Sequence, residues 1–278
     1  MALRLYFTFL LVIMGSTLFG QPMVSHFLAP QADISRGRNF QKIEELSEVI
    51  IRGVAPIPHR VEKHFNSDGF IVSQVALNSV GGRTSETKWE YAKGRSLVRK
   101  HHRFFMNISG WSEEEVLITR DDMTLIPTKI EVLKNGKMWQ WALTVMDTLG
   151  RIESARVFGS TGAHVFSERF MYLEPSNMIR VMVYRANGLF VSTSTYPIDP
   201  KKEFTFESVS RQFYPNGDIM LETLSTAGKG DQAYFYEYEY DGQGNWIEKR
   251  TYQVKLGRNN RISNKNLENR VTRKITYQ

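Results

Sequence analysis

The chain of 278 residues contains no cysteine. This absence excludes disulfide bonds, thiolate metal sites, cysteine nucleophiles and lipid attachment to an N-terminal cysteine. An exported chain without disulfides must be held together by its apolar core, which is ordinary for proteins exported by bacteria. With 41% hydrophobic and 12% aromatic residues, the chain can bury one large or two small globular cores.

Short catalytic motifs are absent as well. The sequence has no GxSxG, HExxH, P-loop or dinucleotide-binding fingerprint, and its six histidines are scattered. We therefore expect no cofactor, no metal site and no enzymatic activity. The formal charge of +7 is interleaved with acids along the chain, so it predicts solubility and weak attraction to polyanions, and not a nucleic-acid groove.

Only one long apolar run is present, and it lies at the N-terminus. Arg4 precedes the run Leu5–Gly15, and the small residues of STLFG follow it, a pattern typical of a secretory signal peptide cut after Gly20. The run is too short for a comfortable membrane span, so no stable transmembrane span is expected after cleavage. Because Leu18 stands where a small residue is preferred, retention of residues 1–20 as an anchor is the alternative. The expected location is the periplasm or the cell surface.

Residues 21–58 are predicted to form a leader to the main fold. Apolar residues recur at helical spacing from Phe40 to Arg52, and Gly53 could cap the helix. β-Branched residues gather between Glu48 and Val54, so a strand there is the competing interpretation.

From residue 59 to residue 278 one phrase keeps returning: an apolar strand, a short turn ending in glycine, and another strand of alternating residues. The Asn135-Gly136 turn is the clearest case, because Asn-Gly is the strongest short hairpin signal. Ser160-Thr161-Gly162 is likewise expected to be a turn. The six copies are HFNSDGFIVSQV from His64, VLKNGKMWQWAL from Val132, VMDTLGRIESARVF from Val145, VYRANGLFVSTSTY from Val183, QFYPNGDIMLETL from Gln212 and YEYDGQGNWIEKRTY from Tyr238.

Such hairpins with no long helical pattern between them predict an all-β fold. We expect an antiparallel meander of repeated β-hairpins in a curved or partly closed sheet. Aromatic residues at period two would form one face of it, and this stripe is expected to face the core, with a sugar-stacking platform as the alternative. The stripe comprises Trp139, Trp141, Tyr236, Tyr238 and Trp246.

The last part of the chain carries a more specific phrase. Tyr240-Asp241 is followed by Gly244-Asn245-Trp246, and the chain closes on Arg273-Lys274-Ile275-Thr276-Tyr277. Residues 234–278 thus resemble the YD-repeat or RHS-repeat family of exported bacterial proteins. The resemblance implies an all-β, non-catalytic scaffold outside the inner membrane. Only one copy carries the full phrase, and the chain is too short for the large shell that some relatives build.

The sharpest local charge cluster is Arg99-Lys100-His101-His102-Arg103. With Trp111, it is the candidate ligand-binding site, for phosphate, lipopolysaccharide or another anionic glycan. Neighbouring side chains on a strand point to opposite faces, so His101 and His102 cannot easily hold one metal ion. The sequence favours a solvated strand edge over such a site, because charged edges keep sheets from pairing with one another.

Clustered carboxylates offer a second chemistry. Glu113-Glu114-Glu115 and Asp121-Asp122 are acids of the kind that glycoside hydrolysis needs in pairs, although a loop of acids before a strand is most often a solvated turn. The function expected from the sequence is an exported, non-catalytic scaffold or binding module, monomeric or weakly oligomeric, for an anionic or carbohydrate ligand or an envelope protein. The alternatives are a glycoside hydrolase that uses the Glu113–Asp122 carboxylates and a β-rich carrier of apolar ligands.

Overall fold

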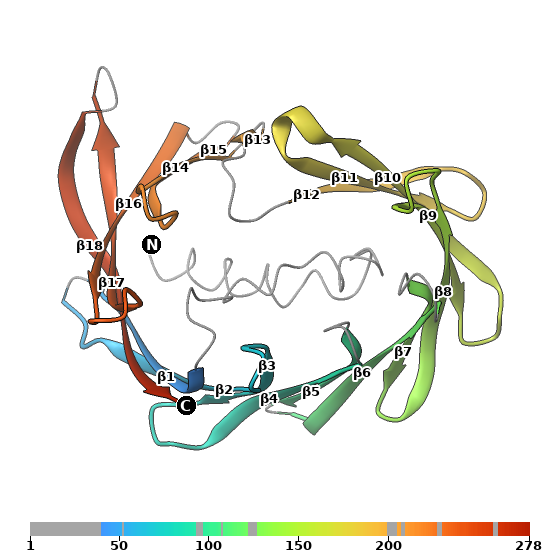
Figure 1. Ribbon diagram of the computed structural model, residues 1–278, viewed down its shortest axis with the longest axis horizontal. Helices are drawn as coiled ribbons and strands as arrows, with labels where there is room; N and C mark the ends of the chain where they lie inside the picture. The colour runs from blue at the N-terminus through green and yellow to red at the C-terminus, as the bar shows by residue number, and fades with distance from the viewer. Residues whose placement is uncertain are drawn as a thin grey trace. The chain divides into compact units, whose positions relative to one another are not determined.

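A computed structural model describes residues 40–51, 53–92, 97–106, 108–121, 127–198, 205–206, 209–226, 230–257 and 261–278. The described residues are almost wholly β-strand, and the sequence prediction of an all-β antiparallel meander is confirmed (Figure 1). One 3-10 turn, η1 at Glu174–Ser176, is the helical element among them. The predicted signal peptide lies outside the described residues. No described helix has the length and apolarity needed to cross a lipid bilayer.

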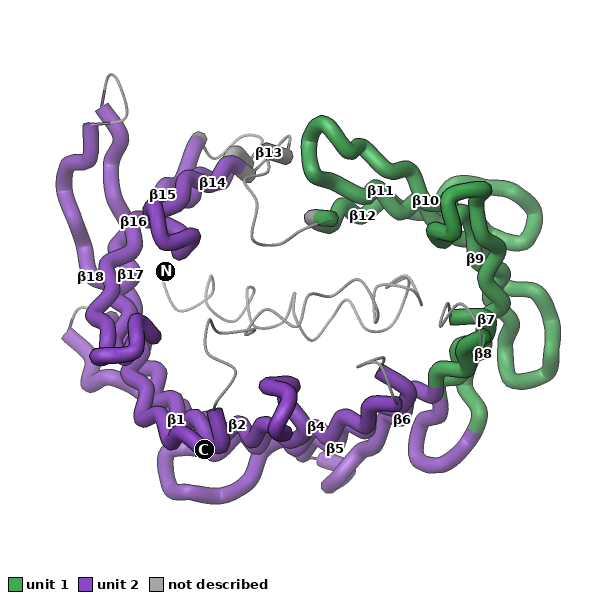
Figure 2. The backbone as a smooth tube through the Cα atoms, viewed as in Figure 1, with its two compact units in different colours: residues 1–30, 118–132, 138–198 green, residues 31–117, 133–137, 199–278 purple. Residues whose placement is uncertain are grey.

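The chain divides into two compact units, coloured separately in Figure 2. Unit 1 holds residues 118–132 and 138–198 of the described chain, and unit 2 holds residues 40–117, 133–137 and the described part of 199–278. In each unit consecutive strands pair antiparallel, and in unit 2 the C-terminal strand β18 also pairs with the N-terminal strand β1. The strands are β1 (Phe40–Val49), β2 (Ile57–Phe65), β3 (Ile71–Leu77), β4 (Arg83–Tyr91), β5 (Leu97–Met106), β6 (Gly110–Arg120), β7 (Pro127–Lys134), β8 (Lys137–Met146), β9 (Ile152–Gly159), β10 (His164–Leu173), β11 (Met178–Arg185), β12 (Phe190–Pro197), β13 (Thr205–Phe206), β14 (Val209–Phe213), β15 (Ile219–Thr226), β16 (Gly230–Tyr240), β17 (Trp246–Leu256) and β18 (Ile262–Tyr277).

The repeated turns share one backbone geometry. In each, the N–H of the glycine donates to the carbonyl three residues before it, and the first residue donates to the carbonyl four residues ahead, as in Asp241-Gly244 and Asp241-Asn245. The glycine has a φ near +80°, for example +80° at Gly244. This is a type I turn closed by a glycine bulge, which explains why the phrase ends in glycine. Asn135-Gly136 instead has two consecutive positive φ angles, 49° and 72°, the two-residue turn predicted from Asn-Gly.

Several turns add a side-chain clamp. The Asp241 Oδ1 atom accepts hydrogen bonds of 2.9 Å from the N–H groups of Gln243 and Asn245, and its Oδ2 atom accepts one from the Tyr277 hydroxyl. The YD aspartate therefore holds its own turn and ties it to strand β18. The same Oδ1 clamp recurs at Asn66, Asn78 and Asp147.

The predicted N-terminal helix is wrong. Residues Phe40–Val49 form strand β1, which pairs with β18 on one side and with β2 on the other. The register shifts between Phe40 and Lys42, so an extra residue is inserted there and Phe40 reaches the same core as Ile43. A bulged strand thereby places apolar residues three apart, a spacing that resembles a helix.

Each unit has its own core. In unit 2, Phe40, Ile43 and Phe65 pack with Ile275 and Tyr277, and the ring centroids of Phe40 and Phe65 are 5.8 Å apart. A second cluster of this unit joins Leu221, Ala233 and Val254. In unit 1 the fully buried residues include Ala142, Ala155, Val157, Val181 and Val183.

Candidate functional site

The basic cluster of the sequence lies on strand β5 and divides between the two faces of the sheet. His101 and Arg103 lie opposite Glu115 and Glu113 of β6, whereas His102 lies opposite Glu114. The expectation that His101 and His102 point apart is thus confirmed. Lys100 shares the face of His102 because residues two apart on a strand lie on one side.

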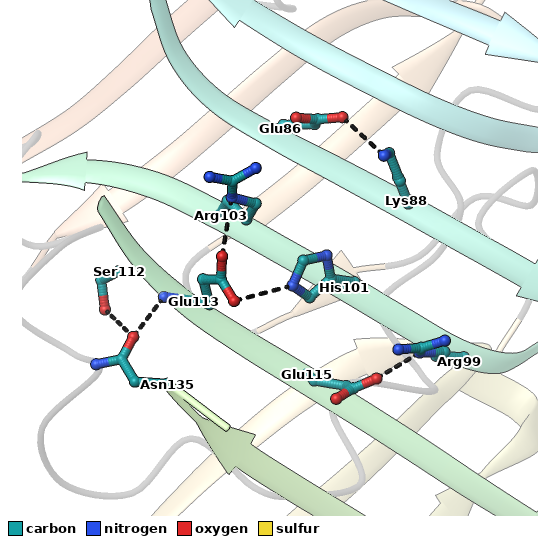
Figure 3. Close-up of polar contacts among 9 residues, drawn as sticks. All are labelled: Glu86, Lys88, Arg99, His101, Arg103, Ser112, Glu113, Glu115 and Asn135. Atoms are coloured by element: carbon teal, nitrogen blue, oxygen red, sulfur yellow. Dashed lines mark hydrogen bonds and ion pairs between the residues drawn. The ribbon is translucent and has the colours of Figure 1, made fainter. Parts of the chain in front are cut away.

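On the face of Arg99, His101 and Arg103, a ladder of ion pairs crosses β4, β5 and β6 (Figure 3). Arg103 Nε lies 3.0 Å from Glu113 Oε1, and His101 Nε2 lies 3.6 Å from Glu113 Oε2. Arg99 bonds to Glu115, and its Nη1 atom lies 3.2 Å from Glu90. The cations of this face therefore already hold carboxylates of neighbouring strands, which is how charged sheet faces are commonly satisfied.

The same ladder bears on the hydrolase hypothesis. Glu113 and Glu115 hold the arginines, while Glu114 points to the opposite face. Glycosidases need two carboxyl groups facing one another across a substrate, whereas the carboxylates of Glu113 and Glu115 are held by Arg103 and Arg99. Asp121 lies beyond the end of β6, and Asp122 lies outside the described residues.

On the opposite face of β5, Lys100 and His102 are partly buried. The Thr87 hydroxyl lies 2.8 Å from His102 Nδ1. Burial lowers the pKa of His102 below its usual 6.5, and the charge of Lys100 lowers it further, although Glu114 opposes the shift. Burial likewise lowers the pKa of Lys100 below 10.5. Lys100 and His102 thus lie in a partly desolvated environment that disfavours the charged form of each side chain.

This environment predicts how stability depends on pH. Because the pKa of His102 is lower in the folded chain than the unfolded value of 6.5, the unfolded chain binds more protons, and stability falls as the pH drops below 6.5. We expect His102→Gln to flatten the pH dependence of the free energy of unfolding between about pH 6.5 and 5, where one proton contributes at most about 1.4 kcal/mol per pH unit.

Urea unfolding at a series of pH values measures this effect. If His102→Gln loses stability on acidification as steeply as the unsubstituted chain, the assignment to His102 is wrong.

Trp111 stands at the start of β6 and is 40% exposed. Its ring meets Phe105 edge-on at 5.8 Å, and the Arg103 guanidinium lies 5.2 Å from the ring centroid. Trp111 is therefore accessible, whereas the basic residues of its own face are engaged in the ion pairs described above.

A second aromatic surface lies in unit 1, on one face of strands β8, β9 and β10. The Trp141 and Phe158 rings stack at 4.2 Å with an interplanar angle of 15°. Phe158 contacts His164 at 5.7 Å, and Trp139 is 49% exposed. We call Trp139, Trp141, Phe158 and His164 the aromatic strip. Leu143 and Val145 continue its face along β8 and are also exposed.

The aromatic strip leads into an open pocket of about 580 Å³ within unit 1. His164 belongs to both, and its Nε2 atom lies 2.9 Å from the Phe166 carbonyl and 3.0 Å from the Ser167 hydroxyl. The volume is in the range of small-ligand sites, which combine apolar walls with a few polar groups. The lining residues are His164, Val165, Phe166, Arg185, Ala186, Asn187 and Val191.

The sequence analysis grouped five aromatic residues into one stripe. In the structure, Trp139 and Trp141 lie in unit 1, and the other three lie in unit 2. The expectation that the stripe faces the core is wrong for Trp139, which is half exposed. Tyr236 and Tyr238 lie in unit 2, where burial raises the pKa of both hydroxyls far above 10. Tyr236 donates a 2.9 Å hydrogen bond to Glu222, and the Arg273 guanidinium covers the Trp246 ring at 3.3 Å.

Sequence reasoning missed the pocket and the part that His164 plays in it. His164 joins the strip because it pairs directly with Phe158 across β9 and β10, after the turn at Ser160-Thr161-Gly162. The turn predicted at Ser160-Thr161-Gly162 could have indicated this contact, since a hairpin places the residues before and after its turn side by side. Among the described residues no cluster of acids and histidines could hold a metal ion.

Comparison with known proteins yields distant structural likeness. No protein-family model matches the chain, and no curated protein matches it. It is similar to a porin-like protein from Bacteroides uniformis, with 12% identity, a TM-score of 0.44, and coverage of 85% of this chain and 98% of that one. A porin-like protein from Bacteroides vulgatus gives 9% identity, a TM-score of 0.27, and coverage of 84% and 97%.

A Photorhabdus luminescens Tc holotoxin pore aligns with 77% of this chain and 15% of its own, at 10% identity and a TM-score of 0.26. At TM-scores this low, the likenesses establish neither a shared fold nor a shared function. The YD-repeat resemblance of residues 234–278 stays a prediction.

Proposed function

We propose that this chain is an exported, non-catalytic β-hairpin module of the cell envelope that binds carbohydrate along the aromatic strip of unit 1. The observation that carries the proposal is a row of aromatic rings, the exposed Trp139 and the partly exposed Trp141 and Phe158, that leads into a pocket at His164. Sugar rings stack on such flat apolar surfaces, and their hydroxyls need polar neighbours.

Polar groups flank the strip on several sides. The Lys129 ammonium lies 5.7 Å from the centre of the Trp141 ring and 2.8 Å from Glu131. Arg185 and Asn187 line the pocket at the other end. Hydroxyl groups of a glycan would find donors and acceptors here, next to a stacking surface.

Two further considerations support a binding role. The basic residues Arg99 and Arg103 are already paired with acids, which favours the strip over strand β5 as the ligand site. The carboxylates of Glu113 and Glu115 are held by arginines, and Glu114 lies on the other face of the sheet, which favours a structural role for these acids over the catalytic pair that glycoside hydrolysis needs. Export rests on the pattern of residues 1–20, and the scaffold role on the YD-like phrase of residues 234–278.

A glycan array followed by isothermal titration calorimetry on the strongest glycan tests the proposal. Trp139→Ala should weaken binding about tenfold, because it removes an exposed stacking ring without touching the buried face of β8. Trp111→Ala removes an equally exposed tryptophan from unit 2 and is the matched control, with unchanged affinity. If no glycan on the array binds, or if both variants lose the same affinity, the chain has no carbohydrate site on the strip. Hydrolysis of the bound glycan by the purified chain would contradict the non-catalytic role.

A further inference from the structure

The exposed large apolar residues of unit 2 collect at one end of its sheet. Because strand direction alternates, the β1–β2, β3–β4 and β5–β6 connections all lie at this end. Among the described residues of unit 2, Tyr240 is the one exposed large apolar residue at the opposite end. Those at the first end are Val49, Val54, Ile57, Val80, Phe105, Met106, Ile108 and Trp111.

The strand register makes these connections neighbours. Arg60 pairs with Leu77, and Leu77 pairs with Arg83, so the β3–β4 connection begins level with Arg60, and the β1–β2 hairpin beside it extends further, to Ile57. The β7–β8 turn joins them: Asn135 N–H donates to the Glu113 carbonyl at 2.9 Å, and Asn135 Oδ1 accepts from Glu113 N–H at 2.8 Å. We call the described residues of 49–60, 78–83, 104–111 and 133–137 the hairpin-end surface.

The charges of this surface have one sign. Its described residues include four lysines and arginines, Arg60, Arg83, Lys134 and Lys137, and no aspartate or glutamate. Three described turns at the opposite end of unit 2 each carry an acid, Asp68, Asp218 and Asp241. The hairpin-end surface is therefore both basic and apolar.

Each of the three hairpin ends presents a separate exposed apolar side chain. Ile108 is 101% exposed, Val80 88% and Ile57 61%, and they come from three different connections. A folded protein partner would need a separate recess for each of them, whereas a fluid lipid layer accepts protruding side chains at any spacing. Phe105 and Trp111 add the aromatic rings that favour the membrane–water interface.

We propose that the hairpin-end surface of unit 2 docks end-on onto the surface of an anionic phospholipid bilayer. The turn residues would enter the headgroup layer, and Arg83, Lys134 and Lys137 would lie near the lipid phosphates. Apolar insertion and attraction between basic side chains and anionic lipids add to each other in such contacts. The ion-pair ladder of β4–β6 stays outside the layer. This contact is independent of the carbohydrate site, which lies in unit 1.

Co-sedimentation with sucrose-loaded vesicles tests the proposal, using the purified full chain. The chain should pellet with vesicles of phosphatidylglycerol and phosphatidylcholine and much less with phosphatidylcholine alone, and added salt should release it. The double variant Val80→Ser/Ile108→Ser should lower the partition coefficient about tenfold, because two inserted aliphatic side chains are lost. Both residues are almost fully exposed, so the variant should keep the melting temperature of the unsubstituted chain.

Leu149→Ser is the matched control. Leu149 is 71% exposed in the same kind of turn but lies in unit 1, and its loss should leave vesicle binding unchanged. Absence of binding, equal binding to neutral vesicles, or full binding by the double variant would each overturn the proposal. A dimer in sedimentation velocity that the double variant dissolves, with no pelleting by vesicles, would identify the surface as a contact between copies and equally overturn it.

Discussion

Glu45→Ala is expected to lower the free energy of unfolding by about 3–5 kcal/mol, the largest effect of any single charge removal that the described ion pairs predict. The Glu45 carboxylate lies 2.9 Å from Lys63 Nζ and 2.5 Å from Arg273 Nη2. The side chains of Lys63 and Arg273 are only 8% and 5% exposed. Removing the acid leaves two cations in a poorly solvated place without this partner, and the cost of a buried charge is then no longer offset.

The neighbouring residue supplies the control. Glu44 points to the opposite face of β1 and pairs with Lys42 at 2.8 Å, with side chains that are 35% and 28% exposed. Glu44→Ala should cost less than about 1 kcal/mol, as exposed ion pairs usually do. Urea unfolding followed by circular dichroism compares the two. Equal losses for Glu44→Ala and Glu45→Ala would show that the buried network does not stabilise the β1–β18 pairing.

Phe40→Ala is expected to cost about 3–5 kcal/mol as well, through a cavity and not through charge. Phe40 is 1% exposed, and its ring lies between Phe65 at 5.8 Å and Tyr277 at 5.5 Å. It therefore joins the first strand to β2 and to the C-terminal strand. The lost contacts come from strands far apart in sequence, so the surrounding residues cannot easily close the space.

Val49→Ala is the control at the far end of the same strand. Val49 is 36% exposed, and its truncation should change stability by less than about 1 kcal/mol. The urea midpoints of both variants measure the difference. If Phe40→Ala unfolds at nearly the same urea concentration as Val49→Ala, the core around Phe40 does not hold β1 in place.

The hairpins were predictable because their signal is local. A glycine with φ near +80° closes turns such as Asn66–Gly69 and Asp241–Gly244, and few other residues adopt this conformation at low cost. Strand β1 was mispredicted for a reason that is not local. Its bulge beside Phe40 is fixed by the pairing with β18, more than two hundred residues away in the sequence.

The ion-pair ladder was in principle within reach of the sequence. His101–Arg103 and Glu113–Glu115 lie at equal distances from Ile108, and an antiparallel hairpin must place them side by side. This symmetry predicts that the basic residues of β5 face the acidic residues of β6. Without it, the cluster resembles an anion site and the acids resemble catalytic carboxylates.

The sequence by itself determined the all-β class, the places of the turns and the alternation that puts Trp139, Trp141, Leu143 and Val145 on one side of β8. These follow from the φ angles of a few residues and from the two-residue period of a strand. Only the tertiary structure decided which side of β8 is exposed, since Ala142 on the opposite side is fully buried. It also decided that Glu45, Lys63 and Arg273 meet. Burial depends on which strands pack together, and that is settled by contacts between distant parts of the chain, which no local pattern contains.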